Sequence, residues 1–276
     1  MSIRSKVKNT LYATQKYKNW LEVVAARVKG QEPDKLILKN GLRIESPVGL
    51  RDLVNEIFFW KFYNPTNLAI GSNDVVVDIG ANTGVFTVFA ASITRKVVYA
   101  FEPFPSTFEV LKRNIDANKL KHVIACCSAV SDKVGSTNLL LNPNDSRQNL
   151  LMEHIFPDKI EKYQVSENLD YLKSDIEEIE KTVEVPTTTL QELMDSYQIE
   201  QIDFLKLDCE GAEEAILQST PEAYLQRVQK IAMEFHDHLT RSNHDELQKL
   251  LEETGFITEL NWEKESPLGF LYAWRK

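Results

Sequence analysis

The sequence is poor in cysteine and lacks a long uninterrupted apolar stretch. Its three cysteines, Cys126, Cys127 and Cys209, match neither the spacing of a zinc site nor the pattern of a disulfide framework. We interpret them as small buried side chains in a reducing compartment. No apolar run reaches the roughly 18 residues that a membrane-spanning helix needs, and no apolar core follows Met1. We therefore expect no signal peptide, no membrane span and a cytoplasmic location.

Basic residues are too few to balance the acidic ones, and the formal net charge is −9. Because proteins that bind DNA or RNA are usually basic, we expect no nucleic-acid partner. Residues 1–30 are the exception, since seven basic residues there face only Glu22, and apolar residues recur at helical spacing. This pattern predicts a basic amphipathic helix that either docks on the protein or makes a peripheral contact with a membrane or a protein.

Strands and helices alternate in the second and larger part of the chain, residues 71–276. Apolar runs predict strands at 75–79, 97–101, 123–126, 203–207, 231–235, 256–260 and 269–274. Helical patterns lie between them at 84–92, 106–118, 212–218 and 245–254. Such alternation is typical of an α/β fold with a doubly wound, mostly parallel sheet. The last two strands are joined by a short loop, so the C-terminal strand should run antiparallel.

Residues 1–70 are expected to form a small N-terminal extension of helices and a hairpin. The hairpin turns at Asn40-Gly41, and an aromatic-rich helix over 50–63 could cover the active site. In the main domain, the polar segment 143–180 interrupts the alternation between paired strands at 137–141 and 181–186. Loops in compact domains are usually far shorter, so we interpret this insertion as a lid or a substrate element.

Residues 75–84 read Val-Val-Val-Asp-Ile-Gly-Ala-Asn-Thr-Gly and form the most informative motif. A buried strand ends in Asp78, and Gly80 and Gly84 predict a tight strand-to-helix turn that a ligand can approach closely. A dinucleotide turn has three glycines and binds a pyrophosphate, which the carboxylate of Asp78 would repel. A ligand with an ammonium or a sulfonium group would be attracted instead, which indicates S-adenosylmethionine.

A second acidic residue, Glu102, ends the next predicted strand within the motif Phe-Glu-Pro-Phe-Pro. A carboxylate at this point can accept hydrogen bonds from both hydroxyls of a ribose. Pro103 should then flank the nucleoside. The small residues that begin at Ser128, after the third strand, suit contact with its base.

Two later motifs place further polar side chains at the same edge of the sheet. Asp208 and Glu210 follow the strand 203–207, and His236 follows the strand 231–235. Since ligands of open α/β sheets bind at the carboxyl ends of strands, these residues are candidates for catalysis, and each could serve as the general base. Asp208 could instead orient the amino group of the cofactor. Their linear spacing matches no metal site, so we expect activity without a metal.

The motifs Asp-Ile-Gly-Ala-Asn-x-Gly, Phe-Glu-Pro-x-Pro, Leu-Lys-x-Asp-x-Glu-Gly-x-Glu and Glu-Phe-His occur in this order, and together they resemble the FkbM-type methyltransferases. The resemblance covers about residues 35–240. It implies a class I methyltransferase (Rossmann-like) fold and transfer of a methyl group to a hydroxyl of a sugar, a glycan or another metabolite. It implies that Asp78, Gly80, Asn82, Gly84 and Glu102 contact the cofactor and that Asp208 and Glu210 form the edge of the active site.

Other functions fit parts of this sequence. A methyltransferase acting on an amino group is one alternative, but adenine-N6 enzymes carry Asn/Asp-Pro-Pro-Tyr/Phe where this chain reads Asp208-Cys-Glu-Gly. A scaffold protein that binds the cofactor without catalysis and acts through its basic N-terminal helix is a second. A nicotinamide enzyme is a third, and the missing middle glycine argues against it.

Overall fold

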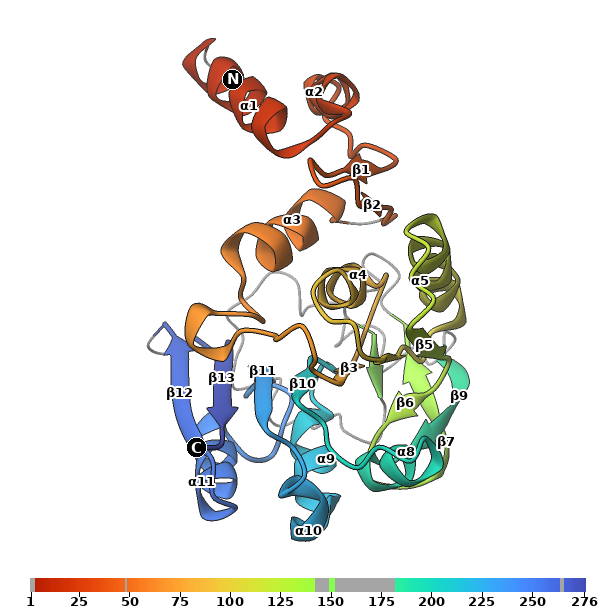
Figure 1. Cartoon of the computed structure of the whole chain (residues 1–276), viewed down its shortest axis with the longest axis vertical. Coiled ribbons are helices and arrows are strands. Elements are labelled where there is room, and N and C mark those ends of the chain that lie inside the picture. The colour runs from red at the N-terminus through yellow and green to blue at the C-terminus, as the bar shows by residue number, and fades with distance from the viewer. Residues whose placement is uncertain (1–2, 48, 142–148, 152–181, 264–265) are drawn as a thin grey trace.

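The computed structural model describes residues 3–47, 49–141, 149–151, 182–263 and 266–276. Its centre is a seven-stranded sheet in the order β12-β13-β11-β10-β3-β4-β5 (Figure 1). The strands span β3 (Val76–Ile79), β4 (Val98–Phe101), β5 (Val123–Cys126), β10 (Phe204–Leu207), β11 (Lys230–His236), β12 (Ile257–Trp262) and β13 (Leu268–Trp274). All neighbours from β5 to β11 pair in parallel, and β13 is antiparallel to both β11 and β12. The predicted sheet is therefore confirmed.

Helices pack on both faces of this sheet. Neighbouring residues of a strand point to opposite sides, so each strand contributes side chains to both faces. Val77 belongs to an apolar layer that also contains residues of α8 (Leu190–Ser196), α9 (Glu213–Ser219), α10 (Glu222–Leu225) and α11 (His244–Glu253). Val76 packs on the other face with α4 (Val85–Ala91). The helix α5 (Pro105–Ala117) lies on the same side as α4 (Figure 1). Two apolar layers thus hold the strands in place, and the carboxyl ends of the parallel strands meet at one edge.

The N-terminal extension packs into the apolar layer that contains Val76. Its elements are α1 (Ile3–Lys16), α2 (Trp20–Val28), β1 (Leu36–Ile37), β2 (Arg43–Ile44), α3 (Leu50–Val54), a π-helical segment (Asn55–Trp60) and a short 3-10 turn (Thr66–Leu68). The predicted hairpin is β1 paired with β2. The helix expected over 50–63 ends at Trp60, because Lys61 adopts a left-handed conformation with φ of 58°. The chain then turns and brings Tyr63 toward the sheet edge.

A second sheet lies beside the first, in the order β6-β9-β7-β8. It contains β6 (Ala129–Val130), β7 (Gly135–Leu140), β8 (Leu150–Leu151) and β9 (Thr182–Thr188). The expected pairing of 137–141 with 181–186 is confirmed, with Thr137 opposite Val185. Of the insertion 143–180, only residues 149–151 belong to the described part of the chain. The helix α8 was not predicted from the sequence, although Thr189 caps it by accepting a hydrogen bond from the backbone N–H of Glu192.

Candidate active site

A cavity of about 380 Å³ opens at the carboxyl ends of the parallel strands. This size is in the range of small-molecule and cofactor sites. Among the residues predicted for the site, those that line it are Gly80, Asn82, Glu102, Pro103, Asp208, Glu210 and His236. Asp78, Gly84 and Ser128 are not among the residues that line it. The aromatic-rich N-terminal segment contributes Leu53, Ile57 and Tyr63, so it covers part of the cavity as expected.

Asp78 is fully buried and paired with Lys206, which itself lines the cavity. One of its carboxylate oxygens, Oδ2, accepts a hydrogen bond of 2.6 Å from Thr87, and the other lies 3.3 Å from Nζ of Lys206. Burial raises the pKa of Asp78. Burial alone would lower the pKa of Lys206, but Asp78 and Asp208 raise it above its ordinary value. We expected the carboxylate of Asp78 to attract a cationic ligand. In the structure, the ammonium of Lys206 already compensates the charge of Asp78.

The two glycines of the first motif are required by contacts inside the protein. Gly80 has φ of 72°, and a Cβ there would overlap the backbone carbonyl of Asp208. Gly84 has φ of 82°, and a Cβ there would overlap the side chain of Leu111 on α5. Gly80 therefore lets the ends of β3 and β10 approach each other, and Gly84 lets α4 pack on α5. These contacts supply a reason for the glycines that does not involve a ligand.

Two other residues of the cavity wall have left-handed backbones without being glycine. Asn82 has φ of 51° and Glu210 has φ of 52°. Such conformations cost energy and cluster at functional sites. In the turn of the first motif, Oδ1 of Asn82 accepts a hydrogen bond of 2.6 Å from the backbone N–H of Thr83. Thr83 is a residue of the cavity wall, and its buried side-chain oxygen has no hydrogen-bond partner in the described part of the chain.

Glu102 is held at the cavity wall by two backbone groups. Its Oε2 accepts a hydrogen bond of 2.9 Å from the N–H of Asn82, and its Oε1 accepts one of 2.9 Å from the N–H of Phe104. Each carboxylate oxygen retains a further lone pair, so Glu102 can still accept hydroxyl groups from a ligand. Burial raises its pKa to about 7. The position at the end of β4 agrees with the predicted contact to a ribose.

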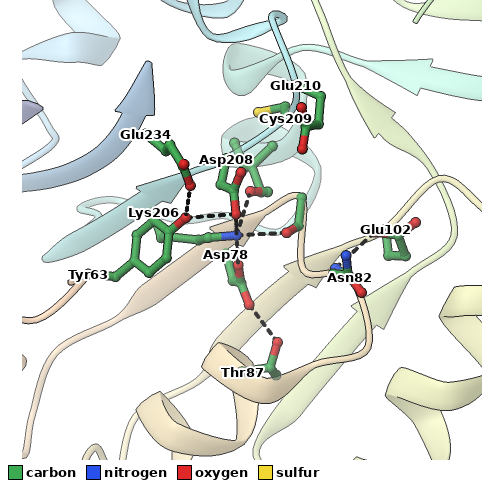
Figure 2. A network of polar contacts seen from close by, with 12 residues as sticks. Tyr63, Asp78, Asn82, Thr87, Glu102, Lys206, Asp208, Cys209, Glu210 and Glu234 are labelled. Carbon is green, nitrogen blue, oxygen red and sulfur yellow. Dashed lines mark hydrogen bonds and ion pairs between the residues drawn. The ribbon is translucent and has the colours of Figure 1, made fainter. Parts of the chain in front are cut away.

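Tyr63 joins two carboxylates of neighbouring strands, as Figure 2 shows. Its hydroxyl lies 2.9 Å from Oδ2 of Asp208 and 2.6 Å from Oε2 of Glu234. A single hydroxyl proton serves only one of the two carboxylates at a time. Lys206 and His236 lower the pKa of Asp208 although burial opposes them, whereas burial and Asp208 raise the pKa of Glu234. The pKa of Glu234 is thus raised and that of Asp208 lowered, so Glu234 takes up a proton more readily than Asp208 does.

His236 is a buried imidazole between two other acidic residues. Its Nδ1 lies 3.3 Å from Oε1 of Glu213, and its Nε2 lies 3.5 Å from Oε2 of Glu210. Burial alone would lower its pKa, but Glu213 and Glu210 raise it well above the ordinary value. Its two acidic neighbours therefore favour the protonated form of the imidazole. The role of His236 as a general base stays a prediction.

His238 also lines the cavity, and the sequence analysis did not single it out. Its ring is hydrogen-bonded to the backbone of Pro267, while Nδ1 is buried and has no hydrogen-bond partner among the described residues. Burial and the charge of His236 lower its pKa to about 4, so the ring is neutral at physiological pH. Nδ1 is thus a buried hydrogen-bond acceptor without a partner among the described residues. Its place two residues after His236, just beyond the strand, was the available signal.

The comparison with known proteins agrees with this geometry. A model of the family described as "Methyltransferase FkbM domain" matches residues 78–258, from the end of β3 to the start of β12. The chain belongs to the FkbM methyltransferase family.

Two methyltransferases illustrate how distant the similar proteins are from this chain. The 31-O-demethyl-FK506 methyltransferase FkbM of Streptomyces tacrolimicus is 27% identical over 197 residues, which cover 67% of this chain and 74% of that protein. Methyltransferase sdnD of Sordaria araneosa is 28% identical over 222 residues, which cover 76% and 83%. A solved FkbM structure from Methylobacillus flagellatus has 12% identity and a TM-score of 0.47, covering 99% of this chain and 60% of that one.

The methyl donor of an FkbM methyltransferase is S-adenosylmethionine, and the cavity suits it. Glu102 offers carboxylate oxygens for the ribose, and the side-chain oxygen of Thr83 lacks an internal partner among the described residues. At the opposite wall, Asp208 and Glu210 offer acidic groups for the amino end of the cofactor or for the acceptor. When bound, the cofactor supplies the methyl group from its sulfonium centre. Direct contacts of Asp78, Gly84 and Ser128 with it remain predictions.

Asp208, Glu234 and His236 are close enough together to be considered as metal ligands. One ligand atom from each lies within 4.8 Å of the others. These groups already have partners inside the protein, since Tyr63 joins the two carboxylates and Glu213 faces the imidazole. Linear spacing does not reveal this cluster, because Glu234 and Asp208 are distant in the chain and meet only through the pairing of β10 with β11.

Proposed function

We propose that this FkbM methyltransferase transfers the methyl group of S-adenosylmethionine to a hydroxyl oxygen of a small molecule or a glycan. The observation that carries the proposal is the set of proton acceptors at one wall of the cavity. Asp208, Glu210 and His238 all line it, as does the carboxylic residue Glu102. A hydroxyl is a poor nucleophile until a base takes its proton, so such acceptors suit this reaction.

Glu210 is the general base in this proposal. Its side chain is about one fifth exposed (22%) and lies 3.5 Å from the imidazole of His236. Burial raises its pKa to about 8, and a base works best when its pKa lies near the working pH. The charged His236 stabilises the ionised form of Glu210. Asp208, held by Tyr63 and Lys206, orients the cofactor or the acceptor.

The name of the relative from Streptomyces tacrolimicus supports oxygen as the acceptor atom, because it gives 31-O-demethyl-FK506 as the compound methylated. An amino group as acceptor is the alternative. A neutral amine carries its own lone pair and needs less help from a base. The set of proton acceptors in the cavity therefore favours the hydroxyl.

Calorimetry tests the first half of the proposal. S-adenosylmethionine and S-adenosylhomocysteine should bind, NAD should not, and Glu102→Ala should weaken binding at least tenfold. Incubation with methyl-labelled S-adenosylmethionine and a panel of glycans, polyols and hydroxylated metabolites tests the second half. Label in an ether bond that Glu210→Gln abolishes, with cofactor affinity retained, is the expected result. Label on nitrogen, or binding of NAD alone, contradicts the proposal.

We also propose that turnover needs no metal ion. Activity should persist after exhaustive treatment with a chelator, since Asp208, Glu234 and His236 already have partners within the protein. Loss of activity that magnesium restores would show that these three side chains bind a cation instead.

A further inference from the structure

We propose that α1 and α2 form a docking surface that binds an anionic membrane peripherally. The proposal concerns the N-terminal end of the molecule and is independent of the methyl acceptor. Figure 1 shows both helices side by side at one end of the structure, beyond α3 and remote from the C-terminal strands. Within the described part of the chain, no helix has the length and apolar character needed to cross a bilayer.

The outward face of α2 is apolar. Leu21, Ala25 and Val28 are spaced by four and three residues and therefore share one side of the helix. Leu21 is 66% exposed and Val28 is 75% exposed, and Leu11 on α1 is 57% exposed. The opposite side of α2 is buried through Val23. Exposed large apolar side chains gathered on adjacent helices are typical of surfaces that bind a membrane or a partner.

Positive charge surrounds this apolar face. Lys18 precedes α2, Lys29 follows it, and both side chains are exposed together with that of Arg27. Residues 1–30 contain seven basic residues and one acidic residue, a formal charge of +6 in a chain of −9. The other 246 residues therefore carry −15. This separation of charge directs the N-terminal end toward an anionic surface and the rest of the molecule away from it.

The helices α1 and α2 pack against the rest of the protein, so the apolar face of α2 has a defined position. Tyr17 is buried and forms a bridge with Leu38 of the hairpin segment. Tyr12 donates a hydrogen bond of 2.5 Å to the side chain of Asn55. The ammonium of Lys16 lies 4.0 Å from the centre of the Phe59 ring. These contacts hold the inner side of α1, and Val23 is the buried residue of α2. They leave Leu21 and Val28 of α2 exposed.

An anionic membrane explains the exposed apolar face and the positive charge beside it better than a second copy of the chain does. Two copies meeting through this face would bring like charges together, which opposes association. Anionic headgroups pair with Lys18, Arg27 and Lys29, while Leu21 and Val28 enter the boundary between headgroups and acyl chains. The two contributions differ in their response to salt, because only the first is screened.

Flotation of the full chain with vesicles tests the proposal. Vesicles of phosphatidylcholine with phosphatidylserine should bind the protein, and vesicles of phosphatidylcholine alone should bind at least tenfold less. Raising the salt from about 0.1 M to 1 M shortens the Debye length from about 10 Å to 3 Å and should weaken binding. The variants Leu21→Glu/Val28→Glu and Lys18→Glu/Lys29→Glu should each reduce binding at least tenfold.

The matched control is Val134→Glu, at an apolar residue that is 63% exposed and lies before β7, far from α2 in the sequence. It should bind vesicles like the parent chain. Circular dichroism and affinity for S-adenosylmethionine report whether each variant folds. Absence of binding to the phosphatidylserine vesicles, or equal loss in Val134→Glu, overturns the proposal. A dimer in light scattering that Leu21→Glu/Val28→Glu dissociates, without vesicle binding by the parent, assigns the face to self-association instead.

Discussion

The ammonium of Lys206 lies 3.3 Å from the carboxylate of Asp78, and the two side chains are 4% and 0% exposed. The lysine also donates a hydrogen bond of 2.7 Å to the carbonyl oxygen of Gly80, and thereby ties β10 to the turn after β3. Asp78, the acidic residue of the first motif, thus supports the turn through its pairing with Lys206. The acidic groups that line the cavity and can meet a ligand are other side chains, among them Asp208 and Glu210.

Replacing Lys206 by Met should destabilise the protein strongly, because Asp78 would be left as a buried charge without its partner. Losing one member of a buried pair typically costs about 3–5 kcal/mol. Urea unfolding measures the change in free energy. The control is Lys230→Met, since Lys230 pairs with Asp74 at 2.9 Å but is 29% exposed, and a pair of this kind contributes about 1 kcal/mol or less. Equal losses in the two variants would show that the Lys206 pair is not special.

Gly80→Ala should be more damaging than its backbone conformation alone predicts. A left-handed residue other than glycine costs roughly 1–2 kcal/mol, and at Gly80 the new methyl group would also collide with the backbone of Asp208. Gly30→Ala separates the two effects, because Gly30 has a similar φ of 70° and an added Cβ there would meet no atom within 4 Å among the described residues. Chemical unfolding should therefore give a clearly larger loss for Gly80→Ala. Comparable losses would mean that the ends of β3 and β10 can separate.

Stability of the apoprotein should fall as the pH rises through 7. The pKa of Glu102 is raised from 4.5 to about 7 in the folded protein, so its proton is retained after the unfolded chain has lost it. The folded state is therefore favoured at low pH, and up to about 3 kcal/mol is lost between pH 4.5 and 7 or slightly above. Glu102→Gln should reduce this slope, measured by urea unfolding at several pH values, whereas the exposed Glu109→Gln should not. An unchanged slope in Glu102→Gln would show that Glu102 is ionised throughout.

The two histidines at the cavity should differ in charge at pH 7. Glu213 and Glu210 raise the pKa of His236, while burial and His236 lower that of His238 to about 4. Nitrogen-15 NMR of the imidazoles should show His236 protonated on both nitrogens and His238 neutral with its proton on Nε2. His236→Gln and His238→Gln assign the signals, and His236→Gln should raise the pKa of His238. A neutral His236 at pH 7 would favour His236 over Glu210 as the general base.

The sheet could be predicted from the sequence because each strand is a short apolar run. The segments before and after each run differ from it in composition. Val76–Ile79 and Phe204–Leu207 are buried on both faces, so their patterns depend little on distant residues. The strand ends then placed Glu102, Asp208 and Glu210 at one edge, where the structure has them lining the cavity. The short elements β6 and α10 were missed, since runs of two to four residues carry almost no periodic signal.

By itself the sequence determined which side chains stand at the carboxyl edge of the sheet, because strand alternation is a local property. Only the tertiary structure decided how those groups pair and which of them carry charge. Lys206 lies beside Asp78 on an adjacent strand, and Tyr63 comes from the N-terminal extension. Glu213, at the start of α9, raises the pKa of His236. A pKa depends on burial and on charges within a few ångströms, and those distances exist only after the chain has folded.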